Sequence, residues 1–96
     1  MENIALYTEL AKKNAAVTLT TICTALSYEL AGIIVNLLLL GAPSVLLINC
    51  HDSIAPAHPN VEDARKLIKT VSAKGISIDY NKIDANAISL NFTFVK

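Results

Sequence analysis

The sequence predicts a single α/β domain of 96 residues, built as a small three-layer, Rossmann-like fold with a mostly parallel sheet and an antiparallel C-terminal edge hairpin. Three observations support this prediction. Short apolar runs alternate with longer segments of helical period, which is the pattern of βαβ units. The chain is too short to form a second core. Its last two strand-like segments lie too close together for a crossover helix, so antiparallel pairing is favoured there.

The N-terminal region predicts a strand, a short helix and a second strand. The apolar run at 4–7 is the first candidate strand, and a short helix through Glu9 to Lys13 follows it. Residues 16–23 are rich in β-branched side chains, whose restricted rotamers suit a pleated sheet. We therefore expect the second strand there.

Residues 25–40 predict a helix that is apolar on more than one side. One stripe has the spacing of three and four that places residues on one helical face; it comprises Leu26, Leu30, Ile33, Ile34, Leu37 and Leu38. Val35, Leu39 and Leu40 lie off that stripe. A helix that is apolar nearly all round must be covered on both sides. We therefore expect helix 25–40 to bind a redox protein or to mediate self-association.

The segment after this helix predicts a central strand. Gly41 can end a helix, and Pro43 cannot continue one. The strand at 44–50 then starts afresh, and its continuous apolar character is typical of a strand buried on both faces.

The C-terminal half predicts one helix and the edge hairpin. Asn60 can cap a helix whose apolar stripe comprises Val61, Ala64, Leu67, Ile68 and Val71, with Gly75 just past its end. Apolar and polar residues then alternate at 76–81 and again at 88–94. Both segments are therefore predicted to be half-buried strands.

The composition limits the classes of partner. Hydrophobic residues make up 53% of the chain and charged residues only 17%, below the roughly 25% usual for a soluble domain. This imbalance predicts extra buried surface at an interface. Eight basic residues offset eight acidic ones, and no basic stripe is interleaved with aromatic residues. The electrostatic pattern of nucleic-acid binding is therefore absent.

The two cysteines and the N-terminal sequence predict a cytoplasmic protein. Cys23 and Cys50 do not form the dense framework of a small secreted domain, and the first ten residues lack a signal-peptide pattern. Residues 30–49 carry no charge over a length that could cross a bilayer. Because Gly41 to Ser44 interrupt this stretch, a membrane segment is disfavoured.

The candidate site lies where two predicted strands end. Ligands of open α/β sheets bind at the carboxyl ends of the strands. Cys23 ends one strand, and Cys50, His51 and Asp52 end the next. If these strands are parallel neighbours, both thiols lie at the same edge, within reach of a disulfide or a shared ligand when they face the same way. The alternative is that both cysteines are inert core residues.

Two further alternatives involve the histidines. Cys50, His51 and His58 are acceptable zinc ligands, with Asp52 as a further donor, although their spacing matches no standard zinc motif. A small enzyme could use Cys50, His51 and Asp52, but adjacent strand residues point to opposite faces, so this requires the strand to end before the pair. No individual catalytic residue is assigned. No glycine-rich nucleotide motif, P-loop or zinc-protease motif occurs.

One known family shares part of this layout. The segment GAPSVLLINCH at 41–51, Cys23 at the earlier strand end, and the helix NVEDARKLIKTVSAKG at 60–75 resemble the delta subunit of methyl-viologen-reducing hydrogenase. That iron–sulfur family passes electrons between hydrogenase and heterodisulfide reductase. The resemblance implies a related fold, an electron-transfer assembly, and cofactor-binding positions at Cys23, Cys50 and His51. It also allows the chain to be a fragment of a larger redox protein.

The sequence departs from that family in its cysteines. The family has further cysteines near its start, beside the strand-end cysteine and after the histidine, and this chain has none of them. Two thiols cannot supply the four-cysteine ligation usual for a [2Fe–2S] cluster. We therefore expect a non-catalytic interaction module of a redox or electron-transfer complex, with cluster ligands largely lost and no cofactor. The alternatives are an iron–sulfur or metal-binding electron-transfer domain using Cys23, Cys50 and His51, and a small Cys/His enzyme.

Overall fold

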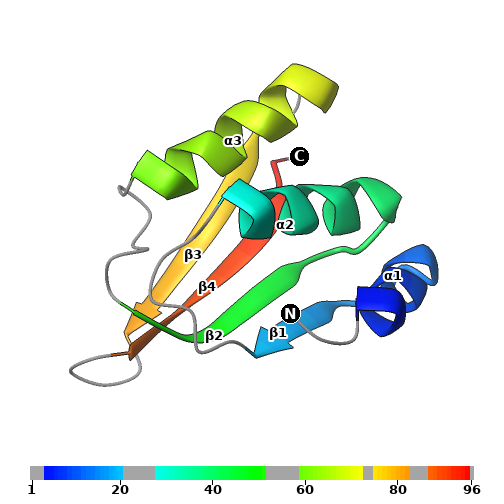
Figure 1. Cartoon of the computed structure of the whole chain (residues 1–96), viewed down its shortest axis with the longest axis horizontal. Coiled ribbons are helices and arrows are strands. Elements are labelled where there is room, and N and C mark those ends of the chain that lie inside the picture. Colours follow the sequence, from blue (N-terminus) through cyan, green and yellow to red (C-terminus); the bar gives the residue numbers. More distant parts are fainter. Residues whose placement is uncertain (1–3, 21–27, 52–58, 73–74, 83–86, 96) are drawn as a thin grey trace.

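The computed structural model describes residues 4–20, 28–51, 59–72, 75–82 and 87–95. Within them the chain forms a small α/β fold of three helices and four strands (Figure 1). In chain order the elements are α1 (Ile4–Lys12), β1 (Val17–Thr20), α2 (Tyr28–Leu40), β2 (Val45–His51), α3 (Pro59–Ser72), β3 (Ile76–Lys82) and β4 (Ala87–Phe94). The strands form one sheet in the order β1-β2-β4-β3.

The sheet is mixed, which corrects the expectation of a mostly parallel, Rossmann-like sheet. Only β1 and β2 pair in parallel, while β4 pairs antiparallel with both β2 and β3. The predicted C-terminal hairpin is confirmed, with Ile76 opposite Phe94 and Lys82 opposite Ile88. Within this hairpin β3 is the edge strand, and β4 lies between β2 and β3. A strand that returns through a short connection must run antiparallel to its predecessor, so its insertion creates two antiparallel ladders.

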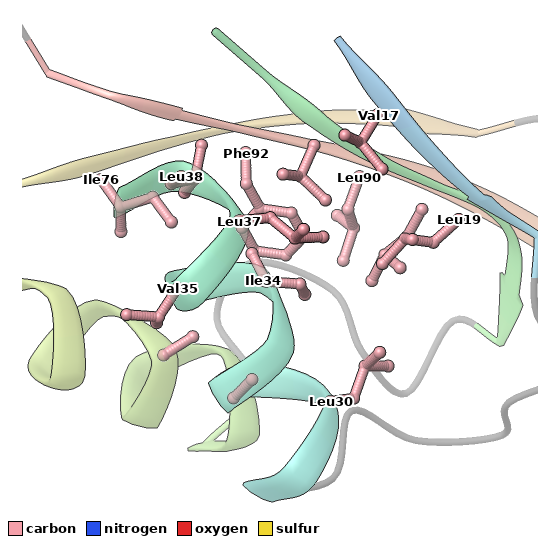
Figure 2. Close-up of a cluster of buried hydrophobic side chains, with 14 of the residues drawn as sticks. Val17, Leu19, Leu30, Ile34, Val35, Leu37, Leu38, Ile76, Leu90 and Phe92 are labelled. Carbon is pink, nitrogen blue, oxygen red and sulfur yellow. The ribbon is translucent and has the colours of Figure 1, made fainter. Parts of the chain in front are cut away.

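The described helices α2 and α3 lie on one face of this sheet, giving two layers rather than the expected three (Figures 1 and 2). The fully buried strand residues all belong to the alternate positions that face these helices: Val17, Leu19, Val45, Leu47, Ile88, Leu90 and Phe92. The intervening positions are half-buried or exposed. Strand β2 is therefore not buried on both faces, because Leu46 and Ile48 are only half-buried.

Helix α2 packs against both the sheet and α3. Figure 2 shows Ile34, Leu37 and Leu38 directed to the sheet side and Val35 directed toward α3. Val35 is only 7% exposed, although Leu39 is 43% exposed. Outside the main stripe of helix 25–40, Val35 is thus covered by α3 of the same chain, whereas Leu39 stays exposed. Neither redox-partner binding nor self-association through helix 25–40 is supported by this packing.

The N-terminal element is a helix, so the prediction of a strand at 4–7 is wrong. A run of four apolar residues fits either structure. Tyr7, Leu10 and Ala11 continue the pattern at helical spacing and pack against the core, with Ala11 fully buried. The Thr8 hydroxyl also donates a hydrogen bond to the Ile4 carbonyl, one turn earlier (2.8 Å). The predicted strand at 16–23 is confirmed as β1 over its described residues.

The uncharged stretch at 30–49 is divided between α2 and β2. Among the described residues, no helix combines the length and apolar character needed to cross a bilayer.

The ends of α1 and α2 are joined by a hydrogen bond. In α2, the Gly41 and Ala42 N–H groups donate to the Leu38 and Leu37 carbonyls (3.2 and 3.1 Å), which is the Schellman pattern of helix termination. Gly41 has φ 125°, a conformation that favours glycine. Its carbonyl accepts a hydrogen bond from Asn14 Nδ2 (3.1 Å), and Asn14 ends α1 in the left-handed conformation (φ 60°).

We predict that Gly41→Ala destabilises the protein by about 1–3 kcal/mol, because alanine is strained at this positive φ. Its Cβ would also lie 2.5 Å from Asn14 Nδ2 and 3.1 Å from the Ala11 carbonyl oxygen. Gly32→Ala is the matched control, since it lies within α2 with nothing within 4 Å of the added Cβ. It should stabilise by about 0.5–1 kcal/mol. Urea denaturation measures both changes. Equal effects of the two substitutions would contradict the positive φ and the close contacts described for Gly41.

We also predict that Val35→Lys destabilises the protein by about 3 kcal/mol, because it places a charge between α2 and α3. Leu39→Lys, on the exposed part of the same helix, should change the free energy of unfolding by no more than about 0.5 kcal/mol. Thermal and urea denaturation would measure the difference. A large effect at Leu39 with none at Val35 would show that the wrong face of α2 has been assigned to the core.

Candidate functional site

The two strands that precede the predicted site residues, β1 and β2, are neighbours in the described sheet. β1 and β2 are parallel neighbours, with Thr20 opposite Ile48, so their carboxyl ends lie at the same end of the sheet. Cys50 and His51 remain within β2, opposite Ile88 and Ala87 of β4. The expected adjacency of the two strands is therefore confirmed.

The side chains of this site lie outside the described part of the structure. This applies to Cys23, Asp52 and His58 as whole residues, and to the side chains of Cys50 and His51. The proposed cofactor set of Cys23, Cys50 and His51, and the proposed metal set that adds His58, therefore remain predictions. Within the described residues, no group of three or more His, Cys, Asp and Glu residues could hold a metal ion.

A β-bulge precedes Cys50. Leu47 is opposite Leu90 and Cys50 is opposite Ile88, so Ile48 and Asn49 together oppose one residue of β4. Bulges increase local twist and occur frequently beside functional sites. The ladder continues to His51, so the strand does not end before the Cys–His pair, which was the condition for the predicted small enzyme.

The helix-free side of the sheet has an unusual composition. We call it the open face, and its described residues are Thr18, Leu46, Ile48, Ser77, Asp79, Asn81, Ser89, Asn91 and Thr93. One row across all four strands runs from Thr18 through Leu46 and Asn91 to Asp79. Only Asp79 in this set is charged, and it lies on the edge strand β3. An ordinary surface is roughly 25–35% charged.

Charged side chains concentrate instead on the helices. The described part of α3 alone carries Glu62, Asp63, Arg65, Lys66 and Lys69. Charge depletion, more than overall hydrophobicity, distinguishes the core of a protein–protein interface from the remaining surface. The open face therefore shares its low content of charge with the core of a docking surface.

Sequence reasoning identified the alternating polar residues but missed this surface. Polar residues at every second position are ordinarily interpreted as solvent-facing. The topology is needed to place Leu46 and Ile48 of β2 beside the uncharged polar residues of β4. The signal available in the sequence was the absence of charge at these positions of β4.

A groove of about 350 Å³ lies between α3 and the start of β3. Its lining comprises Glu62, Arg65, Lys66, Lys69, Gly75 and Ile76. The Arg65 Nη1 atom lies 2.5 Å from Glu62 Oε1, whereas the buried Arg65 Nε has no hydrogen-bond acceptor among the described residues. The α3 side chains share one helical face and were identifiable from their spacing, but the groove beside them depends on the position of β3.

No family model matches this chain, and comparisons with curated proteins and with solved structures also give no match. The resemblance to the hydrogenase delta subunit therefore remains a prediction from the sequence.

We predict that protein purified without oxygen contains no stoichiometric iron or acid-labile sulfide, because two cysteines cannot complete the usual cluster ligation. Metal analysis, a sulfide assay and a visible absorption spectrum test this. Cys50→Ser and Cys23→Ser should leave all three unchanged. Stoichiometric iron and sulfide that are lost in both variants would contradict the prediction and identify the cysteines as ligands.

Proposed function

We propose that this chain is a non-catalytic interaction module that docks onto a protein of a redox or electron-transfer complex through the open face of its sheet. The observation that carries the proposal is the segregation of charge. The helices carry nearly all the charged side chains of the described residues, whereas the open face carries only Asp79.

The chemistry of the open face suits protein docking. Leu46 and Ile48, at its centre on the interior strand β2, supply apolar contact. Thr18 and Asn91 flank Leu46 and supply hydrogen-bonding groups with no charge to desolvate. Burying an uncompensated charge is costly, so an uncharged face lowers the desolvation cost of association.

The dimensions of the molecule are compatible with a specific interface. The principal extents are 34 × 27 × 22 Å, and Figure 1 views the molecule along the shortest. A standard interface takes about 800 Å² from each partner, so docking requires most of the open face together with its rim.

The class of partner comes from the sequence. The resemblance over residues 23–75 supports a redox or electron-transfer complex as the setting, and the missing family cysteines support a module that has lost its cluster. A cytoplasmic location, expected from the sparse cysteines, belongs to the same proposal.

The second candidate is an iron–sulfur or metal-binding electron-transfer domain. One observation favours it, namely the parallel pairing of β1 with β2. Because of this pairing, Thr20 at the end of β1 lies opposite Ile48 of β2. Cys23 follows Thr20 by three residues in the sequence, and Cys50 follows Ile48 by two. Since parallel strands end at a common edge, a ligand shared between them is geometrically reasonable.

Site-specific photocrosslinking tests the docking proposal. A photoreactive amino acid replaces Asn91 or Ser89 on the open face, and replaces Asp63 or Lys13 on the exposed helix side in matched control variants. After illumination in the cells that produce the chain, we expect the open-face variants to form a discrete adduct. Mass spectrometry should identify the captured protein as one that carries flavin, haem or an iron–sulfur centre.

The control positions decide whether the open face is specific. They should give no adduct with that protein, because neither control residue belongs to the open face. Adducts from the control positions alone would contradict docking through the sheet. An open-face adduct with a protein that has no redox centre would support docking through this face. It would contradict the proposal that the partner belongs to a redox complex.

A further inference from the structure

We propose that the groove between α3 and β3 binds an extended acidic peptide segment, which adds to β3 as a fifth strand and places its carboxylates against the basic face of α3. This site lies on the helix side of the sheet edge. It goes beyond docking through the open face and does not depend on it.

The groove has a mostly basic lining. Arg65, Lys66 and Lys69 line it, and Glu62 is the one acidic residue among its lining. Glu62 already pairs with Arg65, and both side chains are over a third exposed, so this pair is weak and easily exchanged. Within the described part of the chain, the groove therefore presents two lysines with no acidic partner and an arginine whose Nε has no acceptor.

The backbone of β3 supplies the second feature of the proposed site. The Val95 N–H donates to the Gly75 carbonyl (2.9 Å), which makes residues 75 and 95 a hydrogen-bonded pair. Such pairs alternate with non-hydrogen-bonded pairs along an antiparallel ladder. Ile76 and Ile78 therefore direct their N–H and C=O groups away from β4. Since β3 ends the strand order of the described sheet, these groups face its outer edge.

The basic face of α3 and the outer edge of β3 are adjacent, and the spacing of side chains along the helix is similar to that along a strand. Ile76 belongs both to the edge strand and to the lining of the groove. Arg65 and Lys69 are four residues apart on α3, or about 6 Å along the helix axis. Alternate side chains of a strand are about 6.8 Å apart. A peptide with carboxylates at every second position can therefore place two of them opposite this helix face while its backbone pairs with Ile76 and Ile78.

The favoured ligand is thus an extended peptide rather than a compact anion. A compact anion would use the cations of α3 but not the strand edge. An uncharged strand would use the edge but not the cations. Only an acidic extended segment uses both parts of the site.

The direct test is a fluorescence-anisotropy titration with a labelled eight-residue peptide in which glutamate alternates with valine. We expect saturable binding that weakens as salt is raised. The same peptide with glutamine in place of glutamate should bind at least about tenfold more weakly, because it loses the charge pairs. A fully N-methylated glutamate–valine peptide should lose at least as much, because it cannot donate to a strand ladder.

The matched protein variants use the same change of charge at two places. Lys66→Glu with Lys69→Glu should weaken binding of the acidic peptide at least about tenfold. Lys12→Glu with Lys13→Glu, at exposed positions of α1 and just beyond it, should change it less than about twofold. Amide chemical shifts of Ile76 and Ile78 should move on binding, since their N–H groups gain partners.

Three results would overturn the proposal. The first is no binding of the acidic peptide at millimolar concentration. The second is binding that both charge-reversal pairs weaken equally, which would indicate nonspecific attraction. The third is equal binding of the N-methylated peptide, which would indicate an anion site without strand addition. None of the protein variants alters the open face, so these results are independent of the crosslinking test.

Discussion

The structure depends on the packing of α2 against both the sheet and α3. The sheet-facing side chains of α2 cover the buried positions of the sheet, including those of the two central strands, and Val35 packs toward α3 on the opposite side of the same helix. Both described layers of the fold meet at this one helix. Because α3 covers the second side of α2 within the chain, the helices form a closed apolar unit on one face of the sheet. The other face is left without a described helix, and this asymmetry determines where charge is placed.

The sequence predicted the elements better than their arrangement. The helices at 25–40 and 60–72 and the C-terminal hairpin have strong periodic signals, and all three are present over their described residues. The run at 4–7 was too short to distinguish a strand from a helix. The order of strands could not be obtained, because whether β4 lies outside β3 or between β3 and β2 depends on long-range packing. The second apolar side of α2 was recognised correctly, but the sequence could not show that α3 would cover it.

The same limit applies to the candidate sites. Chemistry-bearing residue types drew attention to Cys23, Cys50 and His51, and the structure confirms only that β1 and β2 are adjacent and parallel. The open face and the basic groove carry no motif. The open face is defined by missing charge on positions that become neighbours only through the strand order, and the groove by the approach of β3 to one helix of charged residues. Surfaces of this kind arise from the strand order and the helix placement. They can therefore be recognised only once the topology is known.

An isotope-filtered NOE measurement on a mixture of labelled and unlabelled protein tests the central packing most directly, because it separates contacts within a chain from contacts between chains. If α2 packs against α3 of the same chain, we expect intramolecular NOEs from the Val35 methyl groups to the buried α3 side chains Val61, Ala64 and Ile68. Intermolecular NOEs at Val35, or none to α3, would contradict it. In that case α2 would bind another molecule, and the sheet face would no longer be the favoured docking surface.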